Sequence, residues 1–498
     1  MDAFGRFQGF CFLCLPEKPT VMPNTRVISD IRGVSIIRFN TFLVFLAGLL
    51  SLQISAQQFS KSDVLSDLEY LRSSLEETHF DLYAYTSREA FEENYRKVKE
   101  HIKKDSLPIL EVLNLFQRVL AYANNAHTRI AFADYAQPYI AFFQSGGSVF
   151  PLEVAIENGK VLIRKNWSAN PHIPIGAELK SVNGMPIEEI LKKIYPQIAA
   201  ERPYFKNAQL EGFTFPRYYW QVYGEHKAFE IKILSSGRHF TQKVEAIKAY
   251  DDYEMKREDI LKQDWEIKFQ SNSAVYLRPG AFSGDEAKYE HFIDSAFVEI
   301  NSKAVENLII DLRNHPGGDD SFGDYLVSYI ADKPFKWTSK FQLKSSALLK
   351  EDVRKTRDTT EAFWKSVLWH KDGEIYDYDF GFYEPQPEDK RYKGNVYVLV
   401  NRQSYSQSTV TAAQIQDYGF GQVVGEETAE HPNLFASIFT YELPKTGIKV
   451  DVPKGKIQRV NGVDDSQGVI PDILINDHLL DEEDEILDGL LKQLNNTH

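Results

Sequence analysis

The chain has 498 residues, which is too long for one compact core, so about two to four domains are expected. Hydrophobic residues make up 43% of the chain and charged residues 26%, as in ordinary globular proteins, and the formal net charge is −14. This acidic balance argues against nucleic acid or an anionic membrane surface as a partner.

The N-terminal segment 1–56 predicts an exported protein. Arg32 and Arg38 precede an apolar run over 42–50, and the small residue Ala56 follows that run. Basic, apolar and small residues in this order are typical of a secretory signal peptide, and we expect cleavage near Ala56. The run is short for a membrane span, which needs roughly 20 residues, and a signal anchor is the alternative. The predicted location is periplasmic or extracellular, with membrane contact only through this segment if it stays uncleaved.

The cysteine content suits such a location. Cys11 and Cys14 both lie in the upstream segment, so the mature chain would need no disulfide. Along the sequence no group of histidine, aspartate and glutamate has the spacing of metal ligands, and we therefore expect neither a metal nor another cofactor.

Residues 57–130 predict an N-terminal helical domain. Apolar residues recur at helical spacing in three stretches, which are 64–75, 91–98 and 109–123. A polar break that contains His127 follows, and a short strand is expected over 129–132.

Residues 148–236 predict a small β-rich domain. Short strand candidates surround the tight-turn signal Asn183-Gly184, and a helix is expected over 188–195. Gly176, Leu179 and the run Val182-Asn183-Gly184 before a helix resemble a PDZ-type domain. This resemblance implies that an extended peptide binds beside a strand, and a plain β-rich domain is the alternative.

Residues 260–480 predict an α/β core with a mostly parallel sheet, because strand and helix patterns alternate. The expected strands are 275–277, 307–312 and 396–400, and the expected helices are 285–301, 321–331 and 410–418. A charged, aromatic-rich segment over 336–392 interrupts the core as an insertion or lid. A hairpin is expected over 439–452, and an acidic amphipathic helix lies within the C-terminal segment 481–498.

A serine-bearing turn over 401–406 joins the strand 396–400 to the helix 410–418. A serine there would lie at the carboxyl end of a strand and at a helix N-terminus, where ligands bind and negative charge is favoured. Ser404, Ser406 and Ser408 could equally be ordinary capping serines.

Three stretches together resemble the S41 peptidases, which are tail-specific, C-terminal-processing and tricorn-type serine proteases. They are Asp311-Leu-Arg-Asn-His-Pro-Gly-Gly318, the serine unit that ends in Val-Val-Gly-Glu-Glu-Thr428, and Gly468-Val-Ile-Pro-Asp472. The resemblance covers roughly residues 60–480. It implies a βαβ core of the ClpP/crotonase-like type and hydrolysis of peptides or protein C-terminal tails.

The resemblance also implies roles for individual residues. The family nucleophile lies nineteen positions before the glycine of Val-Gly-Glu, here Gly425, and this spacing selects Ser406. The oxyanion donors would be the N–H of Gln407 and that of Gly317 or Gly318.

The expected base departs from part of the family. Processing proteases use a lysine where this chain has His431, whereas tricorn-type members use a histidine of the helical lead-in, which corresponds here to His127. This chain is closer to that histidine-using branch, also represented by IRBP-like proteins. The tricorn-type acid corresponds to Asp465, acting indirectly, and His431 remains the rival base.

The sequence therefore predicts an exported serine endopeptidase with a peptide or protein tail as substrate. A catalytically inactive, peptide-binding member is the alternative, because the lysine is missing and Ala126 replaces the hydroxyl residue or glycine often found before the histidine. His79 and His315 are expected to be structural, and the oligomeric state is left open.

Overall fold

The computed structural model describes residues 57–257, 264–270 and 274–496. The predicted signal segment, with Cys11 and Cys14, lies outside these residues. Within the described part of the chain, no helix combines the length and apolar character that crossing a bilayer requires.

The helical lead-in comprises α2 (Lys61–Thr78), α3 (Arg88–His101) and α4 (Ile109–Leu120), as the apolar spacing predicted. Ser60 and Ser87 cap the first two helices by accepting hydrogen bonds from N–H groups three residues on, at 3.1 Å each. The expected strand over 129–132 was too long: β3 covers only Arg129–Ile130, and an unpredicted helix, α5 (Phe132–Gln144), starts at its end. Pro138 inside α5 hides this helix from a propensity-based reading.

The next segment forms an antiparallel sheet that we call the insert sheet, in the order β10-β9-β7-β6-β5, with β8 paired to β7. Its strands are β5 (Leu152–Glu157), β6 (Lys160–Asn166), β7 (Glu178–Val182), β8 (Met185–Pro186), β9 (Ala228–Ser235) and β10 (Arg238–Glu245). The helices α6 (Ile187–Ile194), α7 (Pro203–Gln209) and α8 (Phe215–Tyr223) complete it. The predicted Asn183-Gly184 turn is present, with both residues at positive φ.

The α/β core has a six-stranded sheet in the order β12-β13-β14-β17-β18-β21, parallel except for the edge strand β12. Its strands are β12 (Glu266–Phe269), β13 (Ala274–Arg278), β14 (Asn307–Asp311), β17 (Asn395–Val400), β18 (Gln422–Gly425) and β21 (Ile473–Leu474). Helices α9 (Glu286–Ser302), α10 (Asp320–Ser328) and α13 (Gln407–Tyr418) pack on one face, and α14 (Glu485–Asn496) packs on the other.

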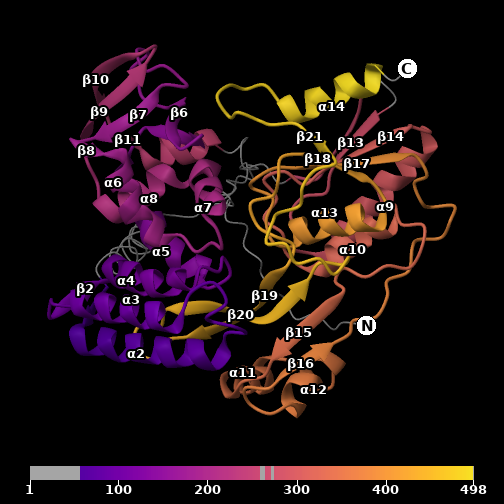
Figure 1. Cartoon of the computed structure of the whole chain (residues 1–498), viewed down its shortest axis with the longest axis horizontal. Helices are drawn as coiled ribbons and strands as arrows, with labels where there is room; N and C mark the ends of the chain where they lie inside the picture. Colours follow the sequence, from indigo (N-terminus) through magenta and orange to yellow (C-terminus); the bar gives the residue numbers. More distant parts are fainter. Residues whose placement is uncertain (1–56, 258–263, 271–273, 497–498) are drawn as a thin grey trace, which may run out of the picture.

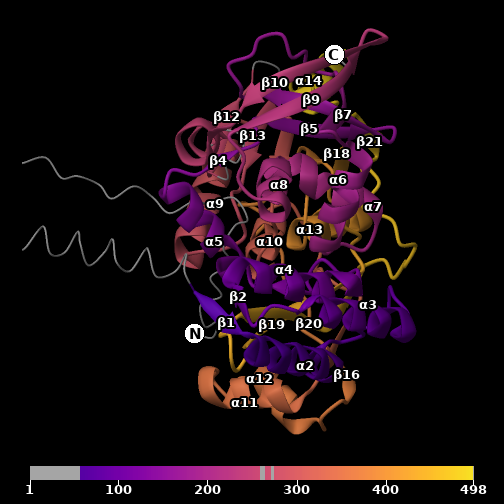
Figure 2. The same cartoon turned by 90° about the vertical axis from the view of Figure 1, so that its left-hand side faces the viewer.

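The segment 336–392 contributes β15 (Lys340–Lys344), α11 (Ala347–Thr356), α12 (Ala362–Trp369) and β16 (Ile375–Tyr378). Its strands extend a sheet with the predicted hairpin, which is longer than expected and consists of β19 (Leu434–Glu442) and β20 (Lys449–Gln458). The lead-in helices share one hydrophobic core with this sheet. Figure 1 shows β19 and β20 running from the core to the lead-in, below the insert sheet. Figure 2 shows α11 and α12 beyond α2, at the far end from the insert sheet.

The remaining short strands form two antiparallel pairs outside the larger sheets. They are β1 (Gln58–Ser60) with β2 (Ser106–Pro108), and β4 (Ser148–Val149) with β11 (Ile247–Lys248).

Candidate active site

Two turns meet at the carboxyl edge of the parallel sheet. β14 and β17 are neighbouring parallel strands, with Asp311 paired to Leu399, so the turns that follow them emerge side by side. The Asn314 N–H donates to Asn401 Oδ1 at 3.0 Å, and Asn401 Nδ2 donates back to Asn314 Oδ1 at 3.0 Å. This reciprocal pair joins the glycine turn to the serine turn, at the edge where open α/β sheets bind ligands.

The three serines of the second turn differ in their contacts. The hydroxyl of Ser404 is buried and donates to Leu312 O at 2.7 Å, and that of Ser408 is buried and donates to His315 O at 3.0 Å. Ser406 is half-buried and has φ 56° and ψ −126°, a left-handed conformation that is strained for a residue with a Cβ. Ser404 and Ser408 therefore build the turn, and Ser406 alone presents its hydroxyl to a titratable side chain.

That side chain is His127. It follows a short 3₁₀ turn after α4, and its Nε2 lies 3.3 Å from Ser406 Oγ, although 279 positions separate the two residues. The ring is 2% exposed and stacks on Tyr405, with centroids 5.1 Å apart. Burial, and secondarily the charge of Arg129, lowers the pKa of His127 to about 3, so the ring is neutral and can accept a proton.

The carboxyl group of Glu430, which sequence reasoning missed, lies on the other side of this ring. Glu430 is fully buried, its Oε1 lies 3.4 Å from His127 Nδ1, and its Oε2 accepts a hydrogen bond from the Ser406 N–H. One carboxyl group thus contacts both the histidine and the backbone of the serine. The one signal for it in the sequence was its position directly before His431, the rival base.

Glu201 lies near the carboxyl group of Glu430. It belongs to the segment between α6 and α7, which with the insert sheet forms what we call the insert. Its Oε1 accepts hydrogen bonds from Asn125 Nδ2 at 3.0 Å and from the Ala126 N–H at 2.9 Å, so it fixes the turn that carries His127. Burial, together with the like charge of Glu201, raises the pKa of Glu430 well above its usual range. Burial also raises the pKa of Glu201, so each of these two neighbouring carboxyl groups disfavours the ionisation of the other.

The glycine turn faces the serine. A Cβ on Gly317, which has φ 81°, would lie 2.6 Å from Gln407 N and 2.7 Å from Ser406 Cβ, so only glycine fits there. The Gly317 N–H donates to His315 Nδ1 at 3.0 Å, and His315 Nε2 donates to Gly280 O at 2.6 Å. Because the Gly317 amide is engaged by His315, the exposed Gly318 is the glycine that remains a candidate oxyanion donor beside Gln407, the first residue of α13.

Neither the predicted acid Asp465 nor the rival base His431 has a hydrogen bond to Ser406 or His127 among the described residues. Asp465 is exposed, and its Oδ1 accepts a hydrogen bond from the Gln467 N–H at 3.2 Å. His431 is buried, and its Nδ1 donates to Asn433 O at 3.2 Å. His79 accepts from the Asp81 N–H through Nδ1 and pairs with Thr128 Oγ1 at 2.8 Å through Nε2. Both ring nitrogens of His79 are thus used for structure, as both of His315 are.

The expectation that no acidic and histidine residues share metal-ligand spacing was wrong in one place. Among the described residues, ligand atoms of His478, Asp481 and Glu485 lie within 4.8 Å of one another, because the start of α14 folds the preceding loop onto its first turn. Such a set can hold a divalent cation. However, His478 Nε2 already lies 2.8 Å from Glu485 Oε1, so two of the three ligand atoms contact each other directly.

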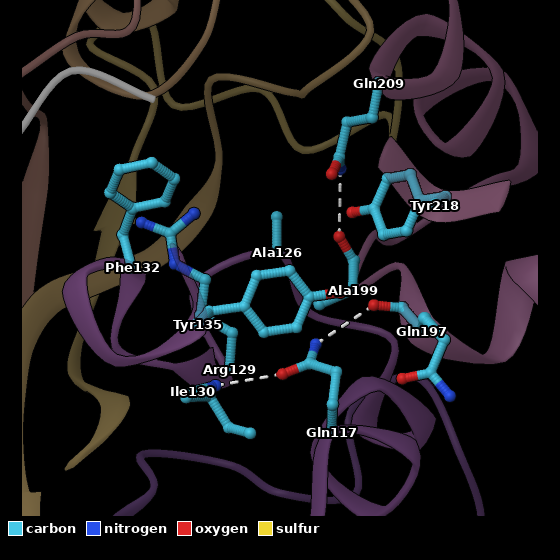
Figure 3. A pocket seen from close by; sticks show the side chains of 10 residues that line it. All are labelled: Gln117, Ala126, Arg129, Ile130, Phe132, Tyr135, Gln197, Ala199, Gln209 and Tyr218. Carbon is cyan, nitrogen blue, oxygen red and sulfur yellow. Dashed lines mark hydrogen bonds between the residues drawn. The ribbon is translucent and has the colours of Figure 1, made fainter. Parts of the chain in front are cut away.

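A small cavity lies behind the histidine turn, between the lead-in and the insert. Figure 3 shows Gln117, Gln197 and Gln209 lining it, with Ala126 and Arg129 from either side of His127. Its volume of about 30 Å³ is enough for roughly two water molecules and too small for a substrate side chain. Polar and apolar side chains both line it, and its size rules it out as a substrate pocket.

Comparisons with known proteins agree with this architecture. The model of peptidase family S41 matches residues 273–475. Mature CPAF complexed with lactacystin superposes with a TM-score of 0.63 at 16% identity, over 88% of this chain and 97% of that one. A mutant of CPAF gives a TM-score of 0.60 at 15% identity, over 88% and 96%. At such identities these structures establish a shared fold. A search of the curated proteins found no match.

Proposed function

We propose that this chain, a serine-type peptidase that belongs to peptidase family S41, is an exported endopeptidase in which Ser406 is the nucleophile and His127 the base. Its family implies peptide or protein substrates, and we propose that these include protein C-terminal tails. The observation that carries the proposal is the 3.3 Å separation of His127 Nε2 and Ser406 Oγ beside the N–H groups of the glycine turn. This separation suits an unliganded site, where such hydrogen bonds are often slightly long.

The proposed reaction follows from these positions. His127 Nε2 takes the hydroxyl proton as Ser406 Oγ bonds to the scissile carbonyl carbon, and the carbonyl oxygen becomes an oxyanion. The N–H groups of Gln407 and Gly318 stabilise that oxyanion, and losing one such donor costs on the order of 3 kcal/mol. His127 then returns the proton to the leaving amine as the C–N bond breaks. Water repeats the sequence on the acyl-serine and restores the Ser406 hydroxyl.

A fluorophosphonate probe followed by mass spectrometry tests the nucleophile and the base together. We expect an adduct on Ser406 in the wild-type protein and none in Ser406→Ala. In His127→Ala the labelling rate should fall by about 10²-fold or more, the range for loss of a general base. His431→Ala is the matched variant for the rival base and should label at close to the wild-type rate.

The inactive, peptide-binding alternative makes the opposite prediction. It requires that folded wild-type protein forms no adduct and cleaves no peptide. The neutral His127 ring beside a half-buried serine hydroxyl favours the active enzyme over this alternative.

Export is proposed from the N-terminal pattern alone, and mass spectrometry of the secreted protein tests it. The N-terminus of a secreted preparation should lie near Gln57, and an intact N-terminus would contradict cleavage.

A further inference from the structure

We infer that Glu430 is the residue that orients His127 and compensates its charge, in place of Asp465. This inference rests on the proposed function, since it assigns a partner to the proposed base. Glu430 touches no substrate and acts through the histidine, so its role is one of positioning. The argument has three steps, which concern the tautomer of the ring, its charge during the reaction and the geometry of the serine.

The tautomer follows from the facing atoms. His127 Nε2 can take the Ser406 proton only if the neutral ring carries its hydrogen on Nδ1. Glu430 Oε1 lies opposite that atom at 3.4 Å. Both atoms are buried and, within the described residues, make no hydrogen bond to any other group. Glu430 Oε1 is therefore the acceptor that holds the hydrogen on Nδ1 once the pair closes by a few tenths of an ångström.

Charge gives the second step. When His127 accepts the serine proton, a cation forms at a site that is 2% exposed and lies near a second cation, the partly exposed Arg129. Burial without a counter-charge is costly, so an acid must lie close by. The carboxyl group of Glu430 lies 3.4 Å from the ring and can supply that negative charge when it ionises, whereas Asp465 is exposed to solvent, where water screens its charge.

The serine gives the third step. Glu430 Oε2 accepts the Ser406 N–H, while its Oε1 faces the ring, so one side chain sets the separation of nucleophile and base. The same hydrogen bond holds Ser406 in its left-handed conformation. The residue before Glu430 is held as well, because Arg202 Nε donates to Ala429 O at 2.8 Å. The carboxyl group is therefore rigidly placed.

The deciding experiment compares Glu430→Gln with Asp465→Asn. We expect Glu430→Gln to lower kcat by about 10²–10⁴-fold, as loss of an orienting acid does in other serine proteases, with KM changed less than about threefold. The fall in kcat should be at least about tenfold larger than in Asp465→Asn. ¹⁵N NMR of His127 should show the hydrogen moving from Nδ1 toward Nε2, a change that a merely structural role would not produce.

The controls separate this inference from the proposed function. Glu430→Asp keeps the charge but shortens the side chain, and it should recover part of the lost kcat, which also covers the case in which Glu430→Gln folds poorly. Wild-type kcat in Glu430→Gln, or the larger loss in Asp465→Asn, would overturn the inference while leaving the Ser406 adduct intact. Absence of that adduct in the wild-type protein would instead remove the proposed function.

Discussion

At the scale of single residues, burial controls the chemistry of the site. His127 is closed off on three sides, by Tyr405 on its face, Glu430 at Nδ1 and Ser406 at Nε2. A neutral imidazole suits such a place, because burial disfavours the cation. The neutral ring can thus accept a proton at neutral and mildly acidic pH.

The pH dependence of labelling should reveal this burial. A base is lost when it is protonated, so the rate falls as pH drops through the pKa of His127. Because burial and Arg129 lower that pKa from 6.5 to about 3, the rate should show no histidine limb near pH 6.5. The measurement is the second-order rate of fluorophosphonate labelling between pH 5 and 8, with circular dichroism at each pH as the folding control. A half-maximal rate near pH 6.5 would contradict the prediction.

At the scale of elements, helix α13 continues directly from the serine turn and packs closely against α10. α13 starts directly after Ser406 and ends at Gly419, whose φ of 74° closes the helix. α10 approaches α13 closely at Gly323, where a Cβ would lie 2.5 Å from Thr411 Oγ1. The strand–turn–helix pattern predicted here is therefore confirmed as an element, and the glycines are what bring its neighbours close.

Two glycine-to-alanine substitutions separate the steric clash of an added Cβ from the cost of its positive φ. Gly317→Ala would place a Cβ 2.6 Å from Gln407 N, so the serine turn must move and displace the proposed Gln407 donor. We expect kcat to fall by about 10²-fold, the effect of losing an oxyanion donor. Gly419→Ala is the matched control, since it has a similar φ but nothing within 4 Å of the added Cβ. It should cost about 1 kcal/mol of stability and leave kcat unchanged. Equal kcat in the two variants would refute this account.

At the scale of the whole molecule, the insert supports the candidate active site. Arg202 binds Glu427 Oε1 at 2.7 Å and the carbonyl oxygens of Thr428 and Ala429 at 2.7 and 2.8 Å, just before Glu430. Arg402, in the serine turn, contacts Glu157 of the insert at 3.1 Å and Glu211 at 3.3 Å. The insert therefore supports both the loop that carries Glu430 and the turn that carries Ser406.

Removing the Arg202 contacts should lower activity without touching the reacting atoms. Charged hydrogen bonds of this kind are worth about 1.5–3 kcal/mol, so kcat/KM of Arg202→Ala should fall about tenfold if part of that energy orders the loop. Lys165→Ala is the control, because Lys165 also joins the insert to another segment, through the exposed Glu482 at 2.8 Å, but contacts neither loop. Similar kcat/KM values in both variants would show that the insert does not support the loop.

Much of this protein could be predicted from the order of its residues. The β17–turn–α13 unit and the Asn183-Gly184 turn depend on local backbone preferences, which neighbouring residues set. The resemblance to S41 peptidases selected Ser406 among three serines through its spacing to Gly425, and the structure brings this serine to His127, as that assignment requires. The catalytic roles themselves remain predictions until they are measured.

Other features depended on the fold. α5 was missed because a proline lies within it, and its place is stabilised by packing rather than by propensity. The sequence by itself determined the serine turn, the glycine turn and the alternation of strands and helices, because these follow from contacts a few residues long. Only the tertiary structure decided that Glu430 contacts His127, because this contact joins residues hundreds of positions apart. It also decided that Glu430 is buried and Asp465 exposed, and burial then shifts the pKa of a carboxyl group.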